Sequence, residues 1–445
     1  MGKMGGMKLL PVLEGLHSAE AMPRPFLQAF LEEVRNLRQN PGRFSDALHG
    51  QVIATVFEEP STRTRLSFET AAHRLGASVI TVSDGKSSSV VKGESLSDSA
   101  RVIGSYADLL VWRHSCDGAS RRVAQVVDVP VVNGGDGKLG HPTQTLVDLA
   151  TLHQEWGSFA GKTVGILGDL HHGRTARSLA WGLAVLGARI VILPGAGLDW
   201  EAGFERRILD RFGYVLRRVE KPLFKKWTGS PEVRILEPKG MVQKKLFGVE
   251  DPSLDSLDAL YLTRLQTERG ATADRIGYPG ITCEQLKDPL LENTLLLHPL
   301  PRLQELPVSI DADPRARYFQ QAALGPVVRQ VVFLALLRPD LVALPALQPM
   351  PAGEPEHALG PCPNQNCITH AEGLLPPWRV EGNHRRSFLC SYCDSPLEVH
   401  YVGCRSSKRV HPAHSPQVLQ IRPENLCPFQ ERDCSEKEGY VWGGK

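Results

Sequence analysis

The stretch Gln51–Leu75, QVIATVFEEPSTRTRLSFETAAHRL, predicts a strand, a turn and a helix in direct succession. Residues 51–57 form an apolar run of strand length, and apolar residues recur at helical spacing through 66–75. Between them, Ser61–Thr64 combines natural helix N-cap residues with three hydroxyls and a guanidinium. The free N–H groups and positive dipole end of the helix would face the same turn, which suits it to bind a phosphate. An ordinary capped helix with an exposed arginine is the alternative for this stretch alone.

The alternation of strand and helix patterns continues on both sides of this stretch. One unit has predicted strands at 52–57, 78–82, 108–113 and 129–133 and helices at 94–106 and 142–156. A second unit has strands at 162–168, 190–193, 259–263 and 294–298 and a helix at 175–186, before a helical segment that Pro314 opens. This alternation is typical of parallel α/β folds. We therefore expect two doubly wound parallel-sheet domains, 8–150 and 151–313, with a ligand cleft between them.

The composition is that of an ordinary soluble protein. A formal charge of +2 with 22% charged residues in 445 gives no reason to expect nucleic acid or a membrane as partner. The first 17 residues hold no signal-peptide core, and no later segment approaches the length of a membrane span. We therefore expect a cytoplasmic protein. Seven of the nine cysteines fall in the last 85 residues, which argues against disulfides in the main body and for a small metal-dependent module.

Three further motifs follow predicted strands: HPTQ at 141–144, TRLQ at 263–266 and HPLP at 298–301. His141 directly precedes a helix that begins with proline, so the helix amides would face the same site, although a capping or core histidine is the alternative. Arg113 ends an apolar strand, where a buried guanidinium needs an anion. Arg174 and Arg264 together suit a ligand with two carboxylates.

Taken together, the motifs resemble the aspartate and ornithine carbamoyltransferase family. The matching stretches are, in the family's order, FEEPSTRTRLSFETAAHRLGA, VVKGES, WRH, NGGDGKLGHPTQTLVDL, GDLHHGRTARSL, LYLTRLQTER and LLHPLPR. The resemblance extends over residues 8–338. It implies a transferase that needs no organic cofactor and moves the carbamoyl group of carbamoyl phosphate to an amino acid. It also implies that a helix within 314–338 packs back on the first domain.

The resemblance assigns a role to each motif residue. The implied catalytic residues are Arg63, Thr64, Arg113 and His141. The implied carbamoyl phosphate ligands are Ser61, Thr62, Arg63, Thr64, Ser88, Lys92, Arg113, His141 and Gln144. The implied L-aspartate ligands are Lys92, Arg174, Arg264, Gln266, Leu300 and Pro301. Ser88 and Lys92 would reach into a neighbouring subunit's site, so the family implies a homotrimer with shared active sites, whereas a plain surface lysine is the alternative for Lys92.

Aspartate is the expected acceptor. The ornithine enzymes carry a cysteine after the histidine of an HCLP motif, and Pro299 stands there in this chain. The expected product is N-carbamoyl-L-aspartate, formed with phosphate in de novo pyrimidine (UMP) biosynthesis. A transcarbamoylase for another amino acid and a silent structural paralogue are the alternatives. The retained arginines, lysine and histidine of the motifs argue against a silent paralogue.

The region after residue 338 differs in composition. Six prolines and no periodicity at 339–361 predict a linker. Cys362, Cys367, Cys390 and Cys393 form two close pairs separated by 22 residues, a spacing typical of tetrahedral structural zinc. The segment 362–405 also resembles the zinc domain of the aspartate carbamoyltransferase regulatory chain. The resemblance implies an assembly surface that joins trimers or a partner, and nucleic-acid binding is the alternative.

Two further segments carry predictions. The stretch 217–250 is rich in lysine and arginine, and we expect a solvated surface insertion there rather than a basic binding patch. The tail 406–445 is expected to be loose. Its region holds an irregularly spaced candidate for a second metal site, made of Cys404, Cys427 and Cys434 with His411 and His414 nearby.

Overall fold

The computed structural model describes residues 15–83, 93–200, 202–219, 233–239, 256–267, 278–348, 359–381 and 386–443. Its first sheet has five parallel strands in the order β1-β5-β4-β2-β3. They are β1 (Gly15–Leu16), β2 (Val52–Phe57), β3 (Ser78–Val82), β4 (Leu109–His114) and β5 (Val131–Asp136). The helices of this half are α1 (Arg24–Gln39), α2 (Thr62–Arg74), α3 (Leu96–Gly104), α4 (Ala119–Ala124) and α5 (Pro142–Trp156).

A second sheet of six strands follows in the order β11-β10-β6-β7-β9-β8. Four strands are parallel: β6 (Thr163–Gly168), β7 (Arg189–Pro194), β10 (Ala259–Leu262) and β11 (Leu295–Leu297). The other two, β8 (Tyr214–Val219) and β9 (Val233–Pro238), add an antiparallel edge. The helices of this half are α6 (Arg174–Leu186) and α7 (Ala202–Phe212). Short 3₁₀ helices in the chain are η1 (Ala19–Ala21), η4 (Gln285–Lys287), η5 (Pro289–Leu291), η6 (Val308–Ile310) and η7 (Pro423–Asn425).

The antiparallel edge corrects the expectation of a solvated insertion at 217–250 for residues 233–238, which form β9. Val233, Ile235 and Leu236 on β9 are fully buried because Val233 and Ile235 pack into one hydrophobic cluster and Leu236 packs into another. Arg217 on β8 pairs with Glu237 on β9 at 3.3 Å. The remaining basic residues of the stretch at 220–232 and 240–250 lie outside the described residues.

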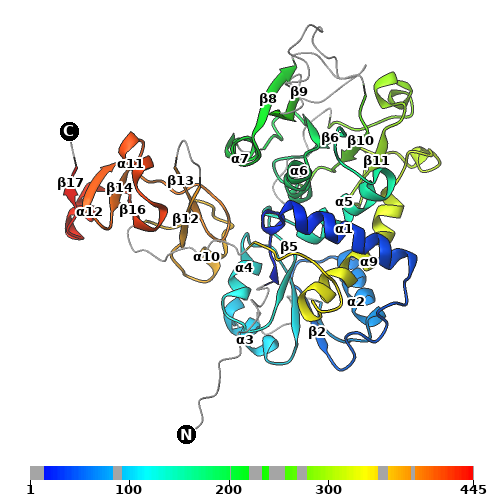
Figure 1. The fold of residues 1–445 in the computed structure, drawn as a ribbon, viewed down its shortest axis with the longest axis horizontal. Helices are drawn as coiled ribbons and strands as arrows, with labels where there is room; N and C mark the ends of the chain where they lie inside the picture. The colour runs from blue at the N-terminus through cyan, green and yellow to red at the C-terminus, as the bar shows by residue number, and fades with distance from the viewer. Residues whose placement is uncertain are drawn as a thin grey trace.

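Helix α9 (Tyr318–Leu337) ties the two halves together. It packs against α5, α2 and α1, and its buried side chains belong to a hydrophobic cluster that reaches both sheets (Figure 1). It begins four residues after Pro314, because a turn at 313–316 precedes it. By length and composition α9 could cross a membrane, contrary to the expectation from the sequence. Most of that apolar surface is buried inside the protein, as in the core helix of a globular protein.

The C-terminal module, residues 359–381 and 386–443, has two small sheets. The first pairs β12 (Trp378–Glu381) with β13 (Ser387–Cys390), and α10 (Ile368–Ala371) precedes it in the chain. The second has the order β16-β14-β15-β17 and consists of β14 (Tyr401–Cys404), β15 (Arg409–Pro412), β16 (Leu426–Phe429) and β17 (Val441–Trp442). Helices α11 (Pro416–Gln420) and α12 (Arg432–Lys437) complete it. The expectation of a loose tail is therefore wrong, since Val410, Cys427, Phe429 and Tyr440 form a buried hydrophobic cluster of their own.

The same sheet separates the side chains of the second candidate metal site. In the β14–β16 register, Cys404 faces Leu426 and Gly403 faces Cys427. Neighbouring strand residues point to opposite faces, so the thiols of Cys404 and Cys427 lie on different sides of the sheet. The side chain of Cys434 lies outside the described part of the chain. Among the described residues, the cysteine cluster able to hold a metal is the other one, at Cys362, Cys367, Cys390 and Cys393.

Candidate active site

A cavity of about 970 Å³ opens where the carboxyl ends of the two sheets meet. Its walls come from the segments that follow β2, β4 and β5 in the first half and β6, β10 and β11 in the second half. Open α/β sheets bind ligands at this edge because the polar loop groups and helix N-termini converge there. The predicted residues that line it are Ser61, Thr62, Arg63, Thr64, Arg113, His141, Gln144, Arg174, Arg264, Gln266, Leu300 and Pro301. Ser88 and Lys92 lie outside the described residues.

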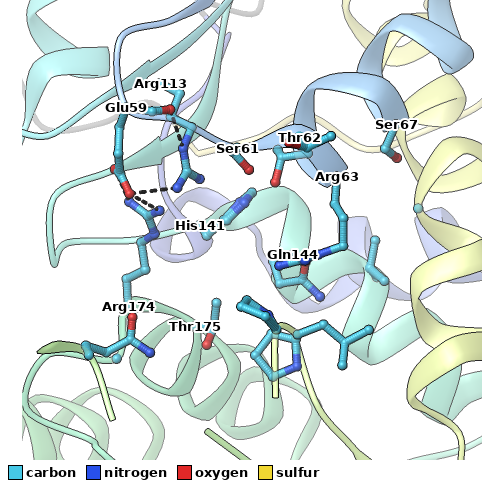
Figure 2. A pocket seen from close by; sticks show the side chains of 18 of the residues that line it. Glu59, Ser61, Thr62, Arg63, Ser67, Arg113, His141, Gln144, Arg174 and Thr175 are labelled. Carbon is cyan, nitrogen blue, oxygen red and sulfur yellow. Dashed lines mark hydrogen bonds and ion pairs between the residues drawn. The ribbon is translucent and has the colours of Figure 1, made fainter. Parts of the chain in front are cut away.

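The turn between β2 and α2 forms one wall. Ser61 is the extended N-cap of α2, yet its side chain makes no capping hydrogen bond. The helix begins at Thr62, so Arg63 and Thr64 stand in its first turn, and both line the cavity. Figure 2 shows Thr62 and Arg63 at this wall. Burial and the neighbouring guanidinium of Arg264 lower the pKa of Arg63. Two cations from different halves of the chain therefore approach each other, an arrangement that an anion between them would stabilise.

Glu59 lines the cavity and was missed by the sequence interpretation. Its carboxylate accepts from Arg113 Nη2 at 2.7 Å and from Arg174 Nη1 and Nη2 at 3.1 and 3.2 Å (Figure 2). Both arginine side chains are nearly fully buried. A buried guanidinium needs an acceptor, so Glu59 holds these two cations side by side. The acidic pair before Pro60 in FEEPSTRT was the available signal, since a carboxylate beside a cationic cradle must be paired with it.

Helix α5 supplies the next wall. His141 is its N-cap, buried, with its backbone N–H donating to Ser178 Oγ at 3.2 Å and its Nδ1 3.5 Å from Thr143 Oγ1. Pro142 occupies the first helical turn, so the free amides there open toward the cavity. Gln144 follows on the cavity face, with its Nε2 donating to Asp148 Oδ1 at 2.7 Å.

The opposite wall belongs to the second half. Gln266 N–H donates to Asp169 Oδ2 at 3.1 Å, which fixes the loop after β10 that carries Arg264. His298 is buried, accepts the Leu300 N–H on Nδ1 at 2.8 Å and contacts Glu305 through Nε2 at 3.0 Å. Burial lowers the pKa of His298. Through these contacts His298 stabilises the 298–301 loop, and the backbone of that loop faces the cavity.

The four cysteines of the C-terminal module form a compact buried cluster. Their sulfur atoms all lie within 4.8 Å of one another, with Cys362 and Cys393 3.5 Å apart and Cys367 and Cys390 3.8 Å apart. A tetrahedron of Zn–S bonds of about 2.3 Å has S–S edges of about 3.8 Å. The cluster therefore fits a structural zinc, which four thiolates would close off from substrate.

The C-terminal module is docked on the main body by buried charges. Arg121 on α4 donates from Nη1 to Asp394 Oδ1 at 2.7 Å and to the carbonyls of Ser391 and Tyr392 at 2.9 Å. Arg207 on α7 binds Glu381 at 2.7 Å. Apolar residues of the module share a cluster with the α3–α4 side of the first sheet. The module thus contacts both halves of the body.

The module also reaches the cavity. Asn366 lines it beside Ser115 and Lys138, and the Asn366 Nδ2 donates to the Ser115 carbonyl at 2.9 Å. None of these three was among the predicted site residues. No pattern in the linear sequence places residue 366 beside residue 115, because only the docking of the module brings them together.

Comparisons with known proteins agree with this architecture. Residues 16–154 match the family model described as aspartate/ornithine carbamoyltransferase, carbamoyl-P binding domain, and residues 360–402 match aspartate carbamoyltransferase regulatory chain, metal binding domain. An aspartate carbamoyltransferase catalytic subunit from Thermoplasma acidophilum is 38% identical over 301 residues, 66% of this chain and 88% of that protein. One from Methanopyrus kandleri is 37% identical over 315 residues, 70% of this chain and 92% of that protein.

Solved structures show the same similarity. The catalytic subunit of M. jannaschii aspartate transcarbamoylase superposes with a TM-score of 0.58 at 34% identity, covering 74% of this chain and 99% of that one. Aspartate transcarbamoylase from Trypanosoma cruzi in complex with aspartate and phosphate gives 0.58 at 30% identity, covering 73% and 96%. With the two family matches in one polypeptide, the chain belongs to the aspartate carbamoyltransferase catalytic subunit family and carries a metal-binding domain of the regulatory-chain type.

Proposed function

We propose that this chain transfers the carbamoyl group of carbamoyl phosphate to L-aspartate in the cavity between its two sheets. One observation carries the proposal: motif residues separated by more than two hundred positions, from Ser61 to Pro301, line a single cavity. The cations within it come from both halves, as two anionic substrates bound side by side require. The product would be N-carbamoyl-L-aspartate, the precursor for de novo pyrimidine synthesis in the cytoplasm.

The proposed carbamoyl phosphate site belongs to the first half. The phosphate would bind to the α2 N-terminus through Ser61–Thr64. Thr64, Arg113 and His141 would donate to the carbonyl oxygen, where negative charge grows in the tetrahedral intermediate. One such donor is worth on the order of 3 kcal/mol in the transition state. Gln144 would hold the carbamoyl amino group.

The proposed aspartate site belongs to the second half. Arg174 and Arg264 would bind the two carboxylates, with Gln266 beside them, and the backbone carbonyls of Leu300 and Pro301 would accept from the substrate amine. With both substrates held in this geometry, positioning and electrostatics supply most of the rate, and the leaving phosphate takes the amine proton. Glu59 would orient Arg113 and Arg174 before substrate enters.

We further propose the domain division 8–150, 151–313, 314–338 and 339–361, whereas the pairing of β14 with β15 and β16 makes 362–405 and 406–445 parts of one C-terminal module. The first two bind carbamoyl phosphate and aspartate respectively. Zinc at Cys362, Cys367, Cys390 and Cys393 would have a structural role. The functional unit would be a homotrimer in which Ser88 and Lys92 enter a neighbour's site, and the C-terminal module would permit assembly beyond the trimer.

A direct assay tests the function. Purified protein is mixed with carbamoyl phosphate and either L-aspartate or L-ornithine, and carbamoylated product is measured. Turnover with aspartate and not with ornithine is expected. Arg63→Ala should nearly abolish that turnover without loss of fold, because the side chain lies on the cavity wall and not in the core. Wild-type kinetics in Arg63→Ala would contradict the phosphate assignment, and turnover with ornithine would contradict the acceptor.

A further inference from the structure

A fully buried carboxyl group stands directly behind the cavity wall. Asp148 lies one helical turn after Gln144 on α5 and has no exposed surface. Its Oδ1 accepts from Gln144 Nε2 at 2.7 Å and from Gln321 Nε2, on α9, at 2.6 Å. Both glutamines line the cavity. Asp148 itself does not touch the cavity, so its contact with any substrate would pass through these side chains.

The chemistry of the acceptor decides the orientation of Gln144. The two ends of a glutamine amide have almost the same shape, and only the hydrogen-bond partners distinguish them. A carboxylate oxygen accepts and does not donate, so the amide nitrogen of Gln144 must face Asp148. The carbonyl oxygen of Gln144 then points to the other side, toward the cavity that the residue lines. That oxygen can accept from an N–H of a ligand and cannot donate to one.

The surroundings of Asp148 keep this arrangement in either protonation state. Burial raises the pKa of Asp148 to about 7, and the charge of Arg329 on α9 opposes the rise. Arg329 is itself buried, with Nη1 3.0 Å from Ser67 Oγ. Since Oδ1 already accepts two N–H groups, a proton would sit on Oδ2. Oδ1 therefore stays an acceptor for both glutamines.

We propose that Asp148 is a positioning residue that holds the Gln144 carbonyl toward the carbamoyl amino group. The site thereby selects carbamoyl phosphate over acyl phosphates that carry a methyl group in place of that amino group. The inference rests on the proposed function of the cavity. A free glutamine can turn its amide and present its NH2 to the ligand. A glutamine held by Asp148 offers an unpaired acceptor to a methyl group, which costs the free energy of a buried unsatisfied oxygen.

Besides the hydrogen bond from Gln144, a second chain of hydrogen bonds joins Asp148 to the opposite wall of the cavity. Gln321 Oε1 accepts the backbone N–H of His298 at 3.0 Å, at the start of the loop with Leu300 and Pro301. Gln321 thus joins Asp148 to the loop proposed to hold the aspartate amine. The two hydrogen-bond chains can be tested separately, since the first passes through Gln144 and the second through Gln321. Loss of Gln321 should act mainly on aspartate, and loss of Asp148 on both substrates.

The test compares Asp148→Leu, Asp148→Asn and Gln321→Leu in the full chain. For each, kcat/KM for carbamoyl phosphate and the inhibition constant of acetyl phosphate are measured with aspartate saturating, and then the KM for aspartate. Asp148→Leu should reduce the preference for carbamoyl over acetyl phosphate about ten-fold or more. Asp148→Asn retains an oxygen at the Oδ1 position and should keep most of the preference. Gln321→Leu should raise the aspartate KM and change the preference less than about three-fold.

Several outcomes would overturn the inference. An unchanged preference in Asp148→Leu, or a loss in Asp148→Asn as large as in Asp148→Leu, would show that the acceptor oxygen does not act on selectivity. If Asp148→Leu does not fold because Arg329 loses its counter-charge, Asp148→Leu combined with Arg329→Met removes both charges, and Arg329→Met alone is its reference. Absence of turnover in the wild-type protein would instead refute the proposed function. The two failures are therefore distinguishable.

Discussion

Replacement of Arg121 by methionine should loosen residues 390–394, here called the zinc loop, from the main body. The Arg121 side chain is only 5% exposed, and it binds Asp394 and the carbonyls of Ser391 and Tyr392. Ser391 and Tyr392 lie between Cys390 and Cys393, and Asp394 directly follows Cys393. The zinc loop therefore cannot open without breaking these hydrogen bonds. Methionine retains most of the apolar stem and removes only the guanidinium, which limits the change to the polar contacts.

The magnitude follows from burial. Breaking a buried ion pair costs about 3–5 kcal/mol. Arg379 still binds Asp394 at 2.6 Å after the substitution, so the carboxylate keeps one partner and the lower end applies. A loss of about 3 kcal/mol corresponds to an increase of roughly 10²-fold in the population of the open zinc loop. Zinc should therefore pass to an excess of a chromophoric chelator about 10² times faster than in the wild-type protein.

Arg101→Met on α3 is the matched control. Arg101 pairs with Asp98 at 3.1 Å, but both side chains are more than half exposed. An exposed pair contributes about 0–1 kcal/mol, so this variant should release zinc within about five-fold of wild type. Equal release rates in Arg121→Met and Arg101→Met would refute the reasoning, because they would mean that the buried contacts do not hold the zinc loop closed.

Three further predictions follow from the proposed site and assembly. Arg264→Ala should raise the aspartate KM and lower the rate while carbamoyl phosphate binding changes less, and unchanged aspartate saturation would count against its role. Lys92→Ala and Arg63→Ala should each be inactive, yet trimers reassembled from both should regain some activity, and mixed trimers as inactive as either parent would exclude a shared site. Cys390→Ser should lose the zinc and lower the mass measured by light scattering while most trimer activity remains, so an unchanged mass after verified zinc loss would exclude the assembly role.

The local patterns predicted most of the sheet strands and the helices beside the cavity. The strands expected at 52–57 and 78–82 agree with β2 and β3, and the helix expected at 142–156 agrees with α5. These elements have strong periodicity and clear boundaries, such as Pro142 at a helix start. Pro314 was a weaker signal, because a proline that permits a helix start also permits the turn that is found there.

Features that depend on contacts between distant segments were not predictable. The side chains of β9 are buried by hydrophobic clusters built from distant segments, and the sequence did not predict its place between β7 and β8. Asn366 reaches the cavity through the docking of the module, and the role of Asp148 depends on Gln321 from α9. Four-residue strands such as β14 and β15 are too short for periodicity to reveal, so the sequence alone predicted a loose tail.

The docked module and the catalytic body are parts of one polypeptide, so their association is an intramolecular equilibrium. For separate chains, the occupied fraction of such an interface falls as the proteins are diluted or produced in unequal amounts. A tether replaces that dependence with a constant effective concentration, in the millimolar range for a short flexible linker. The Arg121 and Arg207 contacts are thus formed once per catalytic unit at any protein concentration. Because both parts are translated together, each catalytic body is made with one C-terminal module, and no separate control of the module's expression is needed to keep this ratio.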